Sequence, residues 1–261
     1  MRFDTGEVEI DFEMWEGESP PILILHGGGC DRQMYEPLLP VRDRLKAFAY
    51  DARGHGRSSR SDRYRFTDHA NDAISFIDGV IHEPVLLLGH SLGAMTSLAV
   101  AANRPDLATA AILLDPPLYA PEFGLRHFEA PFRMVQMAAG QPFEAIVGPI
   151  TSVGLPEAFA RSISWLDGAF FGQMIDGSAF EGWETDKFLR SVRCAVLLQH
   201  GQPALGSALY PGEVERASTL LKDCRLLEVS DSGHSPFERL PELLPALSDF
   251  IRSATSREAA T

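Results

Sequence analysis

The sequence predicts an α/β fold, a doubly wound and mostly parallel sheet interrupted by an inserted helical lobe. Short, continuous apolar runs alternate with amphipathic helical stretches over most of the 261 residues. Continuous apolar runs are typical of strands that are covered on both faces, as in a parallel sheet. The alternation stops between about residues 116 and 190, where the pattern is helical throughout. Repeated strand–helix–strand units with one long helical interruption indicate this fold class.

The first predicted strand differs from the others. Residues Glu7 to Trp15 alternate between polar and apolar side chains, which favours a half-exposed antiparallel edge strand. The later runs are apolar, and several end in glycine-rich turns. Buried strands are expected at Ile22–Leu25, Ala47–Tyr50, Val85–Leu88, Ala110–Leu114 and Ala195–Leu198, and a last strand is expected at Leu226–Val229. The helical patterns that connect or follow them are Met34–Leu45, Thr67–Val80, Leu92–Asn103, Pro211–Leu221 and Pro236–Ile251.

The interruption after the Ala110–Leu114 strand is too long for a connection. It spans about 75 residues, whereas loops in α/β units usually run about 2–6 residues. It contains nine of the 16 phenylalanines and two of the three tryptophans. We expect a helical lobe whose aromatic side chains line a pocket, with packing of the lobe onto the sheet as the alternative role for any one ring.

Composition excludes several classes of function. Thirty-six acidic and 23 basic side chains give a formal net charge of −13, which disfavours binding to nucleic acid or to a membrane surface. No apolar run approaches the length of a membrane span, and the acidic N-terminal segment does not resemble a signal peptide. Three cysteines at unrelated spacings favour a reducing cytoplasm over a disulfide framework. We expect a cytoplasmic enzyme with a small-molecule substrate, and the oligomeric state stays open.

No cofactor and no metal are expected. The sequence contains neither G-x-G-x-x-G at the start of a helix nor G-x-x-x-x-G-K-[ST], the two phosphate-binding patterns. It also has no H-E-x-x-H and no Cys/His cluster with metal-ligand spacing.

Ser91 is the candidate nucleophile. It stands in Gly89-His90-Ser91-Leu92-Gly93, which matches G-x-S-x-G directly between a predicted strand and a predicted helix. A serine on such a sharp turn projects its hydroxyl above the sheet, and the flanking glycines allow the close approach of strand and helix. The alternative is a serine that only serves the turn.

The His26-Gly27-Gly28-Gly29 turn after an earlier strand is the candidate oxyanion loop. A backbone that must approach a substrate carbonyl closely needs small residues, although the same glycines could form a flexible turn. The expected donors are the backbone N–H groups of Gly28 and of Leu92, the first residue of the helix after Ser91.

His234 is the candidate general base among the three histidines that follow Ser91. It lies in a glycine-containing loop between the last strand and the last helix, and such a loop can reach the strand ends. His127 falls in the helical lobe, and His200, at the end of a strand, is expected to pack or to brace a loop.

Together these motifs resemble the α/β-hydrolase family over nearly the whole chain. The glycine turn, the segment Asp51-Ala52-Arg53-Gly54-His55-Gly56-Arg57-Ser58, the serine turn and the late Gly233-His234 occur in the family's order. The resemblance implies a catalytic sheet with a helical cap after the sixth strand. It therefore divides the chain into a core of residues 1–116 and 191–261 and a cap of residues 117–190. The Asp51–Ser58 segment is expected to brace the site.

The resemblance leaves the third triad member open. The family usually carries an aspartate in G-x-x-D after the seventh strand, but Ala204 stands there. Some members carry the acid at the end of the sixth strand, and Asp115 fits that variant; its alternative role is to cap the turn into Pro116. Glu213 is a weaker rival, in the first turn of a helix.

Haloalkane dehalogenases and epoxide hydrolases resemble this fold but use an aspartate as nucleophile. A serine nucleophile therefore excludes both groups. We therefore expect a serine esterase that cleaves a small apolar or aromatic carboxylic ester through an acyl-enzyme, with Ser91, His234 and Asp115 as its catalytic triad. Two alternatives stay open. One is a carbon–carbon bond hydrolase of a diketone-like substrate, and the other is a non-catalytic, sensor-like member that binds small molecules.

Overall fold

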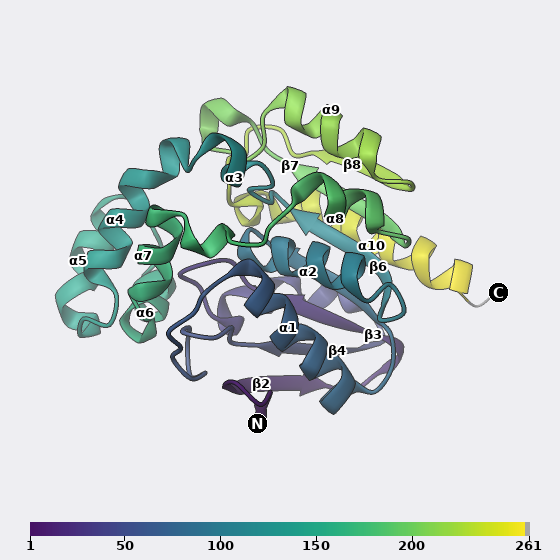
Figure 1. Ribbon diagram of the computed structural model, residues 1–261, viewed down its shortest axis with the longest axis horizontal. Coiled ribbons are helices and arrows are strands. Elements are labelled where there is room, and N and C mark those ends of the chain that lie inside the picture. Colours follow the sequence, from purple (N-terminus) through teal and green to yellow (C-terminus); the bar gives the residue numbers. More distant parts are fainter. Residues whose placement is uncertain (259–261) are drawn as a thin grey trace.

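The computed structural model describes residues 1–258, apart from the side chains at positions 236, 238, 257 and 258, as one eight-stranded sheet with helices on both faces (Figure 1). The strands are β1 (Arg2–Asp4), β2 (Glu9–Trp15), β3 (Glu18–Leu25), β4 (Leu45–Tyr50), β5 (Val85–His90), β6 (Ala108–Leu114), β7 (Ala195–His200) and β8 (Cys224–Glu228). The α-helices are α1 (Phe66–Phe76), α2 (Leu92–Asn103), α3 (Ala120–Phe123), α4 (Glu129–Ala138), α5 (Phe143–Ser152), α6 (Glu157–Trp165), α7 (Ala169–Asp176), α8 (Thr185–Ser191), α9 (Pro211–Leu220) and α10 (Leu240–Glu258). The shorter helical segments are η1 (Arg32–Arg42), η2 (Ile77–Ile81), η3 (Arg126–Phe128), η4 (Ser178–Phe180), η5 (Pro203–Leu205) and η6 (Pro236–Arg239).

The strand order confirms the predicted doubly wound, mostly parallel sheet. It runs β1-β2-β4-β3-β5-β6-β7-β8, and every pair from β4 to β8 in this order is parallel. The predicted edge strand is antiparallel to β4, but it is not the edge, because β1 pairs outside it. β1 has only three residues, too few to show a periodic pattern in the sequence.

Each central strand divides its side chains between two cores. In β3, Leu23 and Leu25 belong to the core on one face and Ile22 and Ile24 to the core on the other. Helices α1, α2, α8 and α9 cover the first face, and η1 and α10 cover the second (Figure 1). Two-sided burial explains why these strands read as continuous apolar runs.

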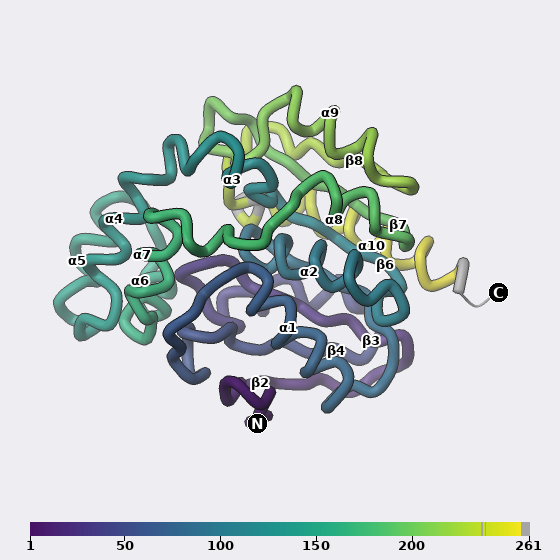
Figure 2. The backbone as a smooth tube through the Cα atoms, viewed as in Figure 1, coloured from purple at the N-terminus to yellow at the C-terminus, as the bar shows by residue number. Residues whose placement is uncertain are grey.

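The insert between β6 and β7 is helical, as predicted. Helices α4 to α7 gather at one end of the molecule, and the chain then runs back across the sheet to α8 (Figure 2). Ile146, Ile150, Ala160 and Ile163 give α5 and α6 a small core of their own. We predicted a core of 1–116 and 191–261 and a cap of 117–190, and this division stays a prediction. Helix α8 falls within the predicted cap range, but it packs on α2 of the predicted core.

Two predicted helices differ in type from an ordinary α-helix. The stretch expected at Met34–Leu45 is the 3-10 helix η1, which contains Pro37 and Pro40. The structure confirms a helical segment here, and its 3-10 form fits the two prolines, because proline lacks the N–H that an α-helical ladder requires. The stretch expected at Thr67–Val80 ends as the π-helical turn η2. None of the helices formed by residues 1–258 is long and apolar enough to cross a membrane.

Candidate active site

Ser91 lies on a strained turn between β5 and α2. Its backbone has φ 50° and ψ −111°, a region that side-chain-bearing residues rarely adopt. Neither flanking glycine has room for a side chain. An added Cβ at Gly89 would lie 2.1 Å from the Gly93 carbonyl oxygen. A Cβ at Gly93 would lie 2.1 Å from the carbonyl oxygen of Leu25. The local sequence therefore fixes both the strand-to-helix turn and the projection of the hydroxyl.

The structure brings Ser91, His234 and Asp115 together. His234 Nε2 lies 2.9 Å from Ser91 Oγ, and His234 Nδ1 lies 2.7 Å from Asp115 Oδ2. The three residues follow β5, β8 and β6, whose parallel strands end at the same edge of the sheet. Ligand sites of open α/β sheets lie at this edge.

Asp115 is fully buried, and its carboxylate is surrounded by donors. Ser207 Oγ donates to Oδ1 at 2.6 Å, and the Ala208 backbone N–H donates to Oδ2 at 2.8 Å. A buried carboxylate needs such partners to remain charged. A carboxylate only accepts, so His234 Nδ1 carries the proton and Nε2 faces Ser91 as an acceptor. Sequence reasoning missed Ser207, because a serine between two strands carries no signal of a long-range contact.

The rival acid and the other late histidines have different partners. Glu213 forms an ion pair with Arg126 and accepts the Tyr210 backbone N–H at 3.0 Å at the start of α9. His127 Nε2 lies 3.0 Å from the Gly206 carbonyl oxygen, and His200 Nδ1 lies 3.1 Å from that of Gly201. Within residues 1–258, none of these three side chains forms a hydrogen bond with Ser91 or His234.

The glycine loop has one amide without a partner. Gly27 N–H donates to Tyr35 Oη at 2.9 Å, and Gly29 N–H donates to His55 Nε2 at 3.2 Å. In the described part of the chain, no hydrogen bond involves Gly28 N–H. Leu92 N–H belongs to the first turn of α2, where helical N–H groups lack an intrahelical acceptor. Both residues line the same cavity as Ser91.

Helix α7 of the insert packs directly on this loop. A Cβ added at Gly28 would lie 2.8 Å from Cε1 of the Phe170 ring, which is almost fully buried. Phe170 also packs edge-on against His55, with ring centroids 4.7 Å apart. Burial and the nearby His26 lower the pKa of His55 to about 3, so its ring stays neutral and Nε2 can accept the Gly29 N–H.

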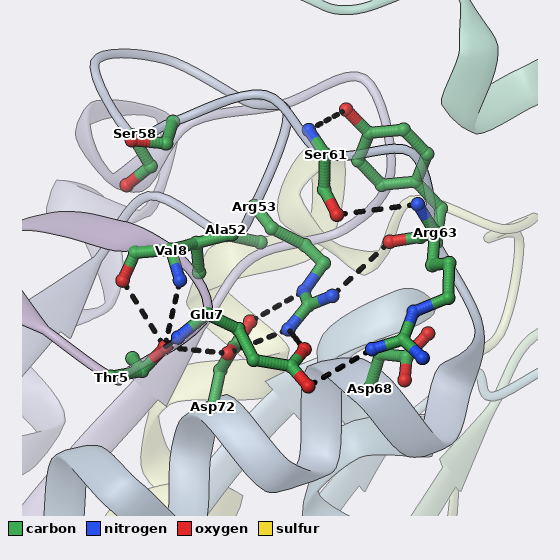
Figure 3. A network of polar contacts seen from close by, with 12 residues as sticks. Thr5, Glu7, Val8, Ala52, Arg53, Ser58, Ser61, Arg63, Asp68 and Asp72 are labelled. Carbon is green, nitrogen blue, oxygen red and sulfur yellow. Dashed lines mark hydrogen bonds and ion pairs between the residues drawn. The ribbon is translucent and has the colours of Figure 1, made fainter.

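The Asp51–Ser58 segment is built around two buried ion pairs, as Figure 3 shows for Arg53. The Arg53 guanidinium donates from Nε to Asp72 Oδ2 at 2.7 Å and from Nη2 to Asp72 Oδ1 at 2.8 Å. Asp51 pairs with Arg32 and also accepts the Arg57 backbone N–H at 2.9 Å. Hydrogen bonds of this kind hold the loop that carries His55, and none of them involves Ser91.

A cavity of about 1010 Å³ contains the candidate site. Its walls are mainly apolar, and Phe128 packs edge-on against His234 with ring centroids 4.7 Å apart. The insert between β6 and β7 contributes most of the aromatic and aliphatic lining: Phe128, Phe132, Val135, Leu155, Phe159, Phe170, Phe171 and Met174. Among the described side chains, the charged lining residues are Glu36 and Arg126, and Arg126 is already paired with Glu213. Among residues 1–258, no group of three or more His, Cys, Asp or Glu side chains could hold a metal ion.

A sequence model of the alpha/beta hydrolase family matches residues 22–245. The chain is 34% identical to 2-(acetamidomethylene)succinate hydrolase of Mesorhizobium japonicum over 116 residues, 44% of this chain and 41% of that protein. It thus spans less than half the length of the curated relatives that it matches.

Two solved structures show the same fold over nearly the whole chain. The structure of E-2-(acetamidomethylene)succinate hydrolase has a TM-score of 0.78 at 24% identity, covering 97% of this chain and 98% of that one. A thermophilic esterase from Thermogutta terrifontis, with malate bound, has a TM-score of 0.74 at 21% identity, covering 95% and 94%. The family match begins in strand β3 and ends in helix α10, so it covers most of the chain. The chain therefore belongs to the alpha/beta hydrolase family.

Proposed function

We propose that this hydrolase cleaves a small apolar or aromatic carboxylic ester through an acyl-enzyme, with Ser91 as nucleophile, His234 as base and Asp115 as the triad acid. One observation carries the proposal. Ser91 and His234, the first two members of the Ser91–His234–Asp115 hydrogen-bond chain, line the same cavity as Gly28, whose N–H has no hydrogen-bond partner among the described residues. A nucleophile, its base and an oxyanion donor around one space are the parts that acyl transfer requires.

The reaction follows from these contacts. His234 Nε2 takes the proton of Ser91 as Oγ attacks the ester carbonyl carbon, and Asp115 stabilises the imidazolium that forms. The N–H groups of Gly28 and Leu92 stabilise the negative charge on the carbonyl oxygen. When the tetrahedral intermediate collapses, His234 returns the proton to the leaving alcohol. A water molecule, activated by the same ring, then attacks the acyl group and releases the carboxylic acid.

The cavity favours a substrate without a negative charge. Aromatic rings of the proposed cap, residues 117–190, form much of its wall, and they bury apolar surface without supplying a charge. Among the described residues, Arg126 is the cationic lining group, and Glu213 neutralises it. A substrate without a carboxylate therefore fits this lining better than a dicarboxylate.

Two other functions can be distinguished by experiment. A carbon–carbon bond hydrolase would use the same triad and oxyanion donors, and product analysis separates it from an esterase. A non-catalytic binding member is motivated by the missing acid after β7. The 2.7 Å contact between His234 Nδ1 and Asp115 Oδ2 supports an acid at the end of β6 in its place.

Labelling with a fluorophosphonate probe tests the proposal. We expect Ser91 to be labelled and the Ser91→Ala protein to be unlabelled and inactive toward p-nitrophenyl butyrate. Ser97→Ala is a matched control, because Ser97 lies in α2 and donates to the Gly93 carbonyl oxygen within the helix. An unlabelled Ser91, with equal activity in the wild-type and Ser91→Ala proteins, would reject the enzyme proposal.

A further inference from the structure

Three hydrogen bonds connect the glycine loop to the loop that carries His234. Gly27 N–H donates to Tyr35 Oη at 2.9 Å, and Tyr35 Oη lies 2.7 Å from His90 Nδ1. His90 Nε2 in turn lies 2.7 Å from the backbone carbonyl oxygen of His234. Tyr35 is 2% exposed and His90 is 6% exposed, so water competes little for these bonds. The chain of bonds joins three segments that are far apart in the sequence.

The direction of every bond in this chain is fixed. A carbonyl oxygen can only accept, so His90 Nε2 must carry a proton and donate it to His234. Burial, with a smaller contribution from nearby His234, lowers the pKa of His90 to about 3, so its ring is neutral and Nδ1 accepts. Tyr35 has one hydroxyl proton, which it donates to Nδ1 while its oxygen accepts the Gly27 N–H. A neutral His90 in its Nε2–H form satisfies all three contacts.

We infer that Tyr35 and His90 are positioning residues, which hold the Gly28 amide and the His234 ring in place around Ser91. The inference rests on the function proposed above. Gly28 follows Gly27, whose amide is anchored to Tyr35, and Ser91 follows His90 in the chain. His234 is held at two points, its carbonyl oxygen by His90 and its Nδ1 by Asp115. Acyl transfer requires that the oxyanion donor, the nucleophile and the base are held in a fixed arrangement relative to one another.

Packing alone does not account for these two side chains. The Tyr35 and His90 rings both pack edge-on against Phe237, with centroid distances of 4.9 Å and 5.2 Å. A phenylalanine at position 35 would keep that ring contact. It would leave the Gly27 N–H and His90 Nδ1 without their partner, and unpaired buried polar groups are costly. The hydroxyl is therefore the part of Tyr35 to test.

Tyr35→Phe and Tyr119→Phe form a matched pair. Tyr119 is also buried, but in the described part of the chain its hydroxyl has no hydrogen-bond partner. We expect Tyr35→Phe to lower kcat for p-nitrophenyl butyrate by roughly 10- to 100-fold while KM changes less than about threefold. The rate at which a fluorophosphonate labels Ser91 should fall in parallel. Tyr119→Phe should leave all three quantities within about twofold of the wild type.

A double-mutant cycle tests whether the bonds act as one chain. Because either single change breaks the chain, Tyr35→Phe combined with His90→Leu should cost little more than the worse single change. Fully additive losses, with all variants folded by circular dichroism, would overturn the inference. Nitrogen-15 NMR of the wild-type protein gives a readout without catalysis. We expect the Nε2–H form of His90 at neutral pH, and an Nδ1–H form would also overturn it.

Failure of this inference differs from failure of the proposed function. If the wild-type Ser91 resists labelling, the esterase proposal fails and the positioning role fails with it. If Ser91 is labelled at the same rate in the wild-type, Tyr35→Phe and Tyr119→Phe proteins, only the positioning role is rejected.

Discussion

Asp115, the proposed triad acid, is held in place by its backbone conformation and by hydrogen bonds to its carboxylate. Its backbone has φ 41°, a left-handed conformation that aspartate tolerates better than most residues, directly after β6. Three donors surround the buried carboxylate, from Ser207, Ala208 and His234. A role limited to capping the turn into Pro116 would not require this set of long-range donors. At the scale of single residues, the geometry therefore favours Asp115 over Glu213 as the partner of His234.

Substitution of the two carboxylates tests this assignment. Asp115→Asn keeps the shape of the side chain but replaces an acceptor by an amide, which favours the wrong tautomer of His234. We expect kcat to fall by roughly 10³-fold or more. Glu213→Gln removes one charge from the ion pair with Arg126 and should change kcat by less than about threefold. Normal turnover in Asp115→Asn, with activity lost in Glu213→Gln, would reverse the assignment.

At the scale of elements, the predictions succeeded where the signal was local and periodic. The turn at Ser91 could be predicted because an apolar strand, two glycines and a helix are adjacent in the sequence. The edge strand β1 could not, since its three residues pair only through the folded sheet. The hydrogen bond between Tyr35 and His90 likewise joins residues 55 positions apart. Side-chain partners of this kind depend on the strand order and on the packing of the folded chain. Local patterns in a single sequence do not predict either of these.

The strand-to-helix turn should tolerate no side chain at Gly93. Gly93→Ala places a Cβ against the Leu25 backbone, so we expect the free energy of unfolding to fall by about 1–3 kcal/mol or more. Gly212→Ala is the control, because Gly212 lies in α9 with nothing within 4 Å of an added Cβ. That change should stabilise the protein by about 0.5–1 kcal/mol. Urea unfolding measures both, and equal effects would contradict the account of the turn.

At the scale of the whole molecule, the cavity lies where the sheet edge meets the inserted helices. Phe132 of α4 lines it and packs against Phe171 of α7 with ring centroids 4.7 Å apart. The exposed side of the same helix carries Met134, which is 59% exposed. The two faces of α4 thus have separate expected roles, one toward substrate and one toward solvent.

Truncation on each face of α4 measures the role of the helix in substrate choice. Phe132→Ala enlarges the cavity, so we expect KM for p-nitrophenyl acetate to rise severalfold and longer acyl chains to become relatively better substrates. Met134→Ala should leave the chain-length profile unchanged. Identical profiles for the wild-type protein and both variants would show that this part of α4 does not contact the acyl or alcohol group.

Buried neutral histidines make the stability of the whole fold depend on pH. Burial lowers the pKa of His55 and of His90 to about 3, below the ordinary value near 6.5. The unfolded chain therefore binds more protons than the folded one between about pH 6.5 and pH 3. Stability should be fully present above pH 6.5 and fall as the pH falls through that range.

Urea midpoints measured from pH 7 to pH 4 test this linkage. His55→Gln should show a shallower loss of stability toward low pH than the wild type. His82→Gln, which replaces an exposed histidine, should keep the wild-type slope. Equal slopes in all three proteins would contradict burial of a neutral His55.

In the proposed reaction, Ser91 carries the acyl group during turnover. Rapid acid quenching of the enzyme with excess p-nitrophenyl butyrate, followed by peptide mass spectrometry, detects such an acyl-enzyme. We expect a mass increase of one butyryl group on the peptide that contains Ser91, and no such adduct in Ser91→Ala. Turnover of the ester with no adduct on Ser91, or with the adduct on another residue, would contradict the proposed mechanism.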